Sequence, residues 1–562
     1  MEKCRPYTVT EDDGIWHYPI KADGSDFLAP IRLCDPFDVI GTGCDLSGQY
    51  FHIIERGGER CLIARGDVGT NDGWRALRNI INIPSARKKL DLLTEYIQDI
   101  QQKSDDLWEI TDTAGWQKDA YILPNGEAIG RAERTYFNGK ISNAKRKAYT
   151  TKGSLDDWKT QIGKYAEGNS RLCLLLGAAF AAPLIKYFGV DGGIIHLYGK
   201  SSSGKTTAQR IAQSVWGHGI DTTESWNTTA FALTNNATAR NDGLLSMDEI
   251  SEDGNGLGVD LSIYALSNGK GRAQGSKDGG NRPEVSFHVL CTSTGEVSLE
   301  NHLLTHGRQI KAGQLVRCPS IPHKLETHHD FADFRSFTQH LNQAISKYYG
   351  TAGRAFITKF SENLPHWSSV ASHLFDEYHE TLIREFSLNS NSQTTRTARL
   401  FAAAMVGIDL ACKFSILTLS KASALESIKQ CFSDWIMPVQ HQTNGKSYEE
   451  NAIEQTAIDY MSRHRFDFVD LEQPCQIPNN FSGYIKKFAD QDDEYYIFSS
   501  VFKNEICKGF DEEAVKTVLY DLGWLQKNQK KRWQFQLYGK LRQSNKSERL
   551  GYFYKFSGIC PK

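Results

Sequence analysis

One short segment constrains the fold of this chain more than any other. Residues 199–206 form a glycine-rich loop, Gly-Lys-Ser-Ser-Ser-Gly-Lys-Thr, directly after the apolar run at 194–198. Residues 206–214 can form a helix after it. A strand, a glycine-rich loop and a helix in this order present backbone N–H groups and a helix N-terminus to phosphates. The segment therefore predicts a P-loop nucleotide site in a parallel α/β sheet.

The loop residue types predict Mg²⁺-ATP as the cofactor. Lys205 is expected to reach the β- and γ-phosphates, and the Thr206 hydroxyl to ligate Mg²⁺. Gly204 lets the backbone turn close to the phosphate. The expected nucleotide contacts are Gly199, Lys200, Ser201, Ser202, Ser203, Gly204, Lys205, Thr206 and Thr207.

An acidic pair follows the loop by some forty residues. The apolar run at 243–247 leads into Asp248 and Glu249. We expect Asp248 to hold the metal and Glu249 to polarise the water that attacks the γ-phosphate. The alternative is a strand that ends in two solvated acids. Lys205 and Glu249 together favour hydrolysis over binding alone.

A third strand is expected at 285–290, followed by the polar segment 291–296. ATPases of the additional-strand type place a polar sensor between the phosphate loop and the acidic strand. Ser293 or Thr294 fits that role. The alternative is a turn at the strand end, capped by hydroxyl groups.

Composition limits the other classes of function. The hydrophobic content of 40% and charged content of 23% are typical of a globular protein, and the net charge of −2 requires any basic surface to be local. The 12 cysteines contain no CxxC pair, which argues against a zinc site or a disulfide framework and favours the cytoplasm. The apolar stretch 172–188 carries Pro183 and Lys186 and is short for a membrane span, so we expect a buried helix and no membrane partner.

The pattern along the chain predicts four domains. Strands at 50–54 and 61–64 and a helix at 86–102 indicate a mixed α/β domain, and the run at 397–419 predicts a long helix. The expected domains are an accessory N-terminal domain (1–153), a P-loop core of AAA+ type (154–322), a helical domain (323–445) and a winged helix (446–562).

Further segments occur in a fixed order around the loop. They are Gly-Trp at 115–116, Tyr-Ile-Leu-Pro at 121–124, Trp-Asn-Thr-Thr at 226–229, Asn-Asp-Gly-Leu-Leu at 241–245, and the stretches 263–272, 293–296 and 312–317. As an ordered set over roughly 35–322, they resemble a helicase-like ATPase family of phages and integrated mobile elements. That family is catalogued as a domain of unknown function and also labelled "inactivated helicase derivatives". The inactivated label does not suit this sequence, which retains its phosphate and metal residues.

The resemblance also implies an assembly. Some relatives look like self-loading replicative helicases similar to the MCM group, which implies a hexameric ring that translocates on DNA. In such rings a hairpin before the sensor strand projects basic residues into the pore. In this chain, the basic residues of segment 268–282 are Lys270, Arg272, Lys277 and Arg282. The alternative is a solvated, glycine-rich loop.

Ring ATPases complete each site with an arginine from the adjacent subunit. Arg317 and Arg308 both follow the sensor strand and are the first choices, with Arg272 as a third. For each arginine taken singly, a surface ion pair is the alternative.

The C-terminal segment resembles a winged helix in outline. Asp511 is a plausible N-cap for a helix over 512–522, and the segments 523–525 and 532–537 suit a β-wing. From 527 to 562 there are ten lysines and arginines against one acid, which favours phosphate contact. The expected DNA contacts are Lys516, Lys530, Lys531 and Arg532. A protein-binding winged helix is the alternative.

These features predict an ATPase that translocates on single-stranded or forked DNA as a replicative helicase of a mobile element. The first alternative is a nucleotide-switched AAA+ regulator, initiator or loader that does not unwind DNA. A small-molecule kinase is disfavoured, because the sequence has no recognisable lid and has a long helical region.

Overall fold

The computed structural model describes residues 7–558. The ranges it leaves out are 46, 100–106, 131–133, 140, 202, 255–256, 272–285, 309–310, 389–392, 444–447, 473–480, 490 and 540–547. The chain forms two compact units. The first comprises Met1–His302, Arg317–Ser387 and Thr397–Phe432, and the second comprises Leu303–Val316, Leu388–Arg396 and Ser433–Lys562.

The first unit begins with mixed α and β structure, as the sequence predicts. A five-stranded sheet has the order β11-β7-β4-β5-β6, and α1 and α2 pack with it over an apolar core that includes Ile54 and Leu93. Smaller sheets join β1-β2-β3 and β10-β9-β8. The bounds are β1 Tyr7–Glu11, β2 Gly14–Tyr18, β3 Ile31–Cys34, β4 Asp38–Cys44, β5 Tyr50–Arg56, β6 Glu59–Ala64, α1 Asn71–Arg78, α2 Arg87–Asp99, β7 Leu107–Thr111, β8 Gly115–Gln117, β9 Ala120–Ile122, β10 Ala128–Gly130 and β11 Thr135–Phe137.

The β8–β9 hairpin is hydrogen-bonded to the turn before the acidic strand. The backbone N–H of Trp116 donates to Asp242 Oδ2 at 3.0 Å, and the Tyr121 hydroxyl donates to the Asp242 carbonyl at 2.7 Å. Gly115 has a φ of +87°, and a Cβ there would lie 2.5 Å from the Asn241 carbonyl. Only glycine fits this close approach. The hydrogen bonds of Trp116 and Tyr121 then hold the β8–β9 hairpin against the central sheet.

The central sheet is parallel and has the order β13-β14-β15-β12-β16. Its strands are β12 Gly192–Tyr198, β13 Glu224–Ser225, β14 Gly243–Asp248, β15 Val289–Gly295 and β16 Ser320–Pro322. The third strand therefore lies between the phosphate-loop strand and the acidic strand, as predicted. Its bounds differ from the prediction, because β15 starts at Val289 and runs through the polar residues to Gly295. A neighbouring strand on each side supplies backbone partners for those polar residues.

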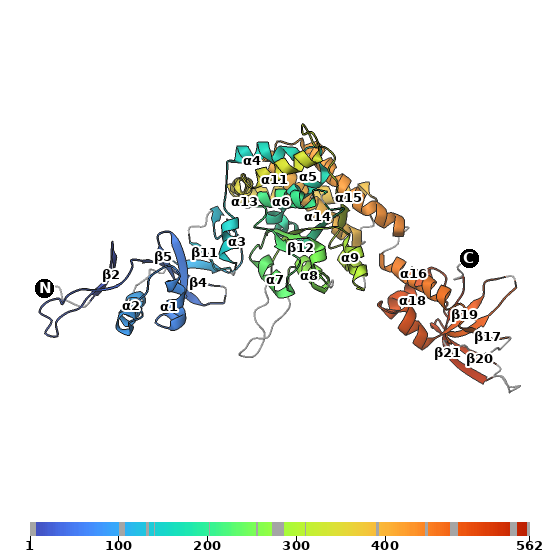
Figure 1. Cartoon of the computed structure of the whole chain (residues 1–562). Coiled ribbons are helices and arrows are strands. Elements are labelled where there is room, and N and C mark those ends of the chain that lie inside the picture. The colour runs from blue at the N-terminus through green and yellow to red at the C-terminus, as the bar shows by residue number, and fades with distance from the viewer. Residues whose placement is uncertain are drawn as a thin grey trace. The chain divides into compact units, whose positions relative to one another are not determined.

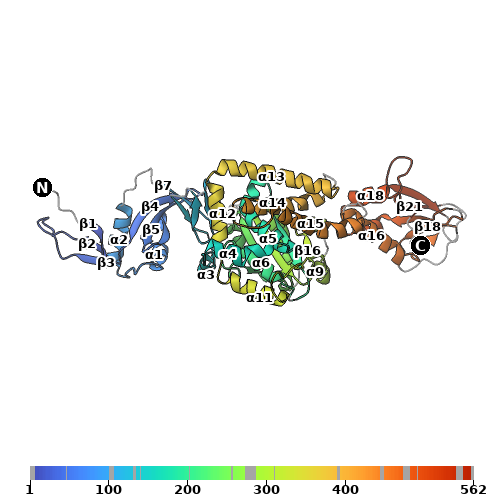
Figure 2. The ribbon, with the colours of Figure 1, turned by 90° about the horizontal axis from the view of Figure 1, so that it is seen from above.

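Helices cover both faces of the central sheet (Figure 1), and Figure 2 shows from above the side that carries α5 and α6. Helices α5 (Ser170–Ala181) and α6 (Lys205–Ser214) lie on one face, and α7 (Ala230–Thr238) and α8 (Leu257–Asn268) on the other. Helix α5 continues into the 3₁₀ helix η4 (Ala182–Phe188). The segment Ser170–Phe188 is apolar and long enough to cross a membrane, but it is 89% buried inside the protein. It is a core helix, as the sequence analysis predicts.

The shorter elements of this part are α3 Asn143–Ala148, α4 Leu155–Gln161, η3 Gly163–Ala166, η5 Ile250–Glu252, α9 Leu299–Thr305 and α10 Ala312–Leu315. The region after β16 is helical, as predicted. Its helices are α11 Phe334–Ile345, α12 Thr351–Ser361, α13 Leu364–Glu385, α14 Gln393–Lys413 and α15 Lys421–Thr443. Helix α14 ends six residues before the predicted position at 419. Ser415, at a φ of +57°, prevents the helix from continuing.

The last part of the chain packs α16 (Tyr448–Arg463) and α18 (Glu512–Asp521) against a sheet of order β17-β18-β19-β21-β20. Asp511 caps α18 through two backbone N–H groups, as predicted. The remaining elements are β17 Phe468–Asp470, β18 Gly483–Lys486, β19 Glu494–Phe498, α17 Ser499–Val501, the π-helical turn η6 Phe502–Ile506, β20 Gln534–Gly539 and β21 Glu548–Phe556. The expected wing of 523–525 with 532–537 is not the pairing observed: β20 pairs with β21, and Leu525 forms only an isolated bridge with Phe556.

Candidate active site

The phosphate loop joins the end of β12 to the start of α6. Gly204 has a φ of +95° and precedes the first turn of the helix, where a side chain would be strained. The Lys205 amine is buried and donates to the carbonyls of Gly199 and Lys200 at 2.8 and 2.9 Å. The first backbone N–H groups of α6 have no acceptor within the helix, so they are available to an anion. Ser202 lies outside the described residues.

The predicted metal residues meet at the ends of three neighbouring strands. Asp248 is the last residue of β14, and its Oδ1 lies 3.4 Å from the Thr206 hydroxyl. The Thr294 hydroxyl of β15 donates to the same oxygen at 2.5 Å. Carboxylate and hydroxyl oxygens are the ligands that Mg²⁺ prefers, so this arrangement fits a magnesium site beside the phosphate loop.

Glu249 follows Asp248 in a strained backbone conformation. Its φ is +48°, which is costly for a residue with a side chain and typical of functional sites. Its backbone N–H donates to the Thr294 hydroxyl at 3.2 Å. Its carboxylate accepts from the Ser251 hydroxyl at 2.6 Å. The Thr294 hydroxyl therefore contacts both acidic residues: it donates to the Asp248 carboxylate and accepts from the Glu249 backbone N–H.

Ser293 faces away from this group. Side chains alternate along a strand, so Ser293 and Thr294 point to opposite faces of β15. The Ser293 hydroxyl lies 2.9 Å from His196 Nδ1 and accepts from Trp226 Nε1 at 2.9 Å. His196 Nε2 donates to the Val297 carbonyl. Burial lowers the pKa of His196 to about 4 and keeps the imidazole neutral, so Ser293 belongs to a buried network that supports the sheet.

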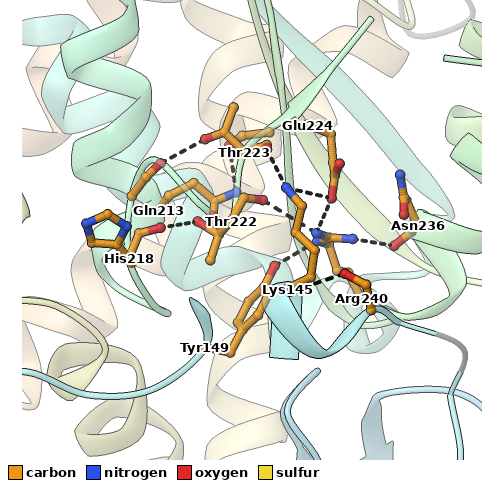
Figure 3. Close-up of polar contacts among 12 residues, drawn as sticks. Lys145, Tyr149, Gln213, His218, Thr222, Thr223, Glu224, Asn236 and Arg240 are labelled. Carbon is orange, nitrogen blue, oxygen red and sulfur yellow. Dashed lines mark hydrogen bonds and ion pairs between the residues drawn. The ribbon is translucent and has the colours of Figure 1, made fainter. Parts of the chain in front are cut away.

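A buried ion pair braces the acidic strand from the outer edge of the sheet (Figure 3). The Arg240 guanidinium is 1% exposed and pairs with Glu224 of β13 at 2.5 Å. Its Nε–H also donates to the Tyr149 hydroxyl oxygen at 2.7 Å, and Lys145 of α3 lies 3.3 Å from the same Glu224 carboxylate. β13 pairs with the last residues of β14. No local sequence pattern indicates this brace, because its members come from three separate segments.

His323 lies beside the phosphate loop and was also not predicted from the sequence. It follows β16, and its ring Nε2 lies 3.5 Å from where a Gly204 Cβ would be. Both ring nitrogens are buried, and the Ser203 backbone lies near the ring. Burial, with Arg171 and Lys205 nearby, lowers the pKa of His323 to about 4. A neutral histidine therefore lies under the phosphate loop.

Other predicted nucleotide contacts differ in their surroundings. Lys200 and Ser201 are exposed on the loop, whereas the Ser203 hydroxyl is buried without a described partner. The Thr207 hydroxyl accepts from Asn342 of α11 at 3.0 Å. The Thr207 hydroxyl therefore links the start of α6 to α11.

The two arginines lie in different surroundings. The Arg317 carbonyl accepts from the N–H of Ile194, near the start of β12, and its guanidinium lies 5.1 Å from the centre of the Tyr264 ring. It is therefore separated from the phosphate loop of its own chain by the length of β12. The backbone N–H of Arg308 donates to the Leu303 carbonyl after α9.

The two described ends of the segment between α8 and β15 pair with each other. Phe287 N–H donates to the Gly269 carbonyl at 2.9 Å, and Lys270 pairs with Ser286 in an antiparallel bridge. Lys270 is exposed. Arg272, Lys277 and Arg282 lie outside the described residues.

The Lys516 side chain is paired within its own helix. Its side chain is 8% exposed and lies 2.6 Å from Glu512 and 2.9 Å from Glu513. Its amine is therefore already neutralised by two carboxylates. Lys530, Lys531 and Arg532 are exposed in the turn before β20.

Within the described residues, no cluster of histidine, cysteine or acidic side chains has the arrangement of a transition-metal site. The described cysteines are free thiols. The Asp248 group combines one carboxylate with the hydroxyls of Thr206 and Thr294.

Comparisons with known proteins agree with this fold. A family model described as "Domain of unknown function (DUF927)" matches residues 7–285. A solved structure titled "SCCmec type IV Cch - active helicase" has a TM-score of 0.71 and 18% identity, and the match covers 98% of this chain and 96% of that chain. A second, titled "The A form apo structure of NrS-1 C terminal region-CTR", has a TM-score of 0.29 and 13% identity over 62% of this chain and 79% of that chain. The search of curated proteins found no match. The chain therefore matches the DUF927 family model over residues 7–285, and nearly its whole length has the fold of a solved helicase.

Proposed function

We propose that the chain is an ATP-hydrolysing DNA translocase of helicase type. The observation that carries the proposal is the meeting of Lys205, Thr206, Asp248, Glu249 and Thr294 at the ends of three adjacent parallel strands. The likeness to a solved helicase fold supports it. A site that only bound nucleotide would not require Glu249 beside the metal residues.

Each residue has a defined task in this proposal. Bound Mg²⁺-ATP supplies a phosphoanhydride bond whose hydrolysis releases the free energy for movement. Lys205 and the N-terminus of α6 hold the phosphates, and Thr206 and Asp248 hold the metal. Thr294 orients Asp248, and Glu249 polarises the attacking water.

The finer features of the proposal follow the sequence. The proposed core is of AAA+ type, and the strand with a polar end between the phosphate-loop and acidic strands supports this part of the proposal. The chain has the four domains predicted above, including a C-terminal winged helix. It assembles as a hexameric ring similar to that of MCM-like helicases, with Arg317, Arg308 or Arg272 completing the neighbouring site and the Lys270 hairpin in the pore. It acts in the cytoplasm in the replication of a mobile element.

The test is ATP hydrolysis with and without single-stranded and forked DNA. We expect DNA to stimulate turnover severalfold and Lys205→Ala to abolish it. Lys270→Ala should remove only the stimulation, because Lys270 is exposed and outside the phosphate site. Lys347→Ala, an exposed lysine after α11, is the matched control and should behave like the wild type.

The outcome also separates the two classes of function. Strand displacement on the forked DNA by the wild type supports the helicase. Hydrolysis that is indifferent to every DNA would contradict it and favour a nucleotide-switched regulator.

A further inference from the structure

The helix that precedes the β20–β21 hairpin is poorly suited to contact DNA. Helix α18 begins with the acids Asp511, Glu512 and Glu513, and the Asp511 carboxylate accepts from the N–H groups of Glu513 and Ala514. These acids occupy the helix end that would otherwise attract a phosphate. Lys516, the one lysine of this helix, is paired with two of its carboxylates. Electrostatics therefore disfavour insertion of α18 into a DNA groove.

The outer part of the hairpin has a different chemistry. Tyr538 of β20 is 57% exposed and Tyr552 of β21 is 50% exposed. Gln536 is the register partner of Tyr552, and Arg549 is the partner of Tyr538. The Arg549 guanidinium lies 4.7 Å from the centre of the Tyr552 ring. Exposed rings and a cation thus form one group, which we call the tyrosine platform (Tyr538, Arg549 and Tyr552).

A β-bulge places these side chains on one face. Residues 549 and 552 are three positions apart and would point to opposite faces of a regular strand. The register shifts between Leu537 and Tyr538, so that Gly551 and Arg549 oppose consecutive residues of β20. The extra residue in β21 turns Arg549 to the side of Tyr552. The local geometry is therefore arranged to combine a cation with two exposed rings.

The turn leading into β20 adds positive charge to the same hairpin. Asn528 Oδ1 accepts from the N–H groups of Lys530 and Arg532, which fixes the turn. Both of these side chains are exposed, and Lys527 lies 4.1 Å from the centre of the Trp533 ring. Aromatic rings alternating with cations are typical of surfaces that bind single-stranded nucleic acid, since every base has a face that can stack.

We propose that the tyrosine platform binds single-stranded DNA, by stacking unpaired bases on Tyr538 and Tyr552 and by contact of Arg549 with phosphate. This inference rests on the proposed DNA-dependent function and names the strand form and the residues that the C-terminal hairpin recognises. The bases of duplex DNA are already stacked and do not present their faces to a protein surface. The platform therefore prefers single strands to duplex.

The test measures fluorescence anisotropy of a labelled thymidine oligonucleotide and of a duplex with the full-length protein. Tyr538→Ala/Tyr552→Ala should weaken single-strand binding at least tenfold, whereas Tyr538→Phe/Tyr552→Phe should keep it within about twofold, because phenylalanine retains the ring. The salt dependence should be unchanged in the tyrosine variants. Arg549→Ala should lower its slope by about 0.7, the value for one lost phosphate contact.

A matched control is available in the N-terminal sheet. Tyr50 is 44% exposed and has Arg65 5.1 Å from its ring centre, so it has the same chemistry away from the platform. Tyr50→Ala should bind DNA like the wild type. ATP hydrolysis without DNA should be unchanged in all these variants.

The outcomes separate this inference from the proposed function. If the Tyr538→Ala/Tyr552→Ala variant binds single strands as the wild type does, while DNA still stimulates hydrolysis, the platform is wrong and the translocase proposal stands. Equal weakening of single-strand and duplex binding also overturns the platform. If the wild type binds no DNA, both proposals fail.

Discussion

The hydroxyl of Thr294 offers the most direct test of the site. It donates to Asp248 Oδ1 at 2.5 Å and accepts from the backbone N–H of Glu249 at 3.2 Å. Thr294→Val keeps the shape and removes both bonds. A hydrogen bond to a charged group contributes about 1.5–3 kcal/mol, and each 1.4 kcal/mol is a factor of ten. We therefore expect ATP turnover to fall about 10- to 100-fold.

The assay is steady-state ATP hydrolysis over a range of Mg²⁺ concentrations. Because Asp248 is proposed to hold the metal, the variant should also require more Mg²⁺ for half-maximal rate. Ser293→Ala is the neighbouring control: its hydroxyl lies in the His196 network, so it should lower the melting temperature more than the Mg²⁺ requirement. The reasoning is refuted if Ser293→Ala abolishes turnover while Thr294→Val retains it.

Three further predictions concern stability. Arg240→Met leaves Glu224 with Lys145 as its remaining ion-pair partner, and loss of a buried partner costs about 3–5 kcal/mol of stability. Calorimetry should therefore record a lower melting temperature. An unchanged melting temperature would contradict the proposed role of the Arg240–Glu224 pair. The pKa of His196 is lowered to about 4 in the folded protein, so the unfolded chain binds a proton at a higher pH than the folded chain does. The free energy of unfolding should therefore fall by up to about 3 kcal/mol as the pH drops from 6.5 to 4. This loss should be absent in His196→Asn. Lys516→Met should lower the melting temperature without changing the affinity for single-stranded DNA in the anisotropy assay. A large loss of affinity would support Lys516 as a DNA contact.

The local sequence determined the main elements of the nucleotide site. A strand, a loop with Gly204 and Lys205, and a helix follow from short-range preferences, and a strand ending in Asp248 and Glu249 follows from its apolar pattern. The position of the third strand between them was also predicted. The likeness of these elements to an ordered family pattern supplied the expectation of a ring on DNA.

Tertiary structure decided which side chain faces which partner. Ser293 and Thr294 are equivalent in sequence, and the register of β15 between β14 and β12 decided that Thr294 meets the acids. Lys516 is one of many C-terminal basic residues, and only the fold of α18 places it between two carboxylates. His323 comes to the phosphate loop because β16 pairs with β12, and sequence distance hides that pairing. Residue type and spacing determine which chemistry is possible, whereas strand register and burial decide which side chains perform it.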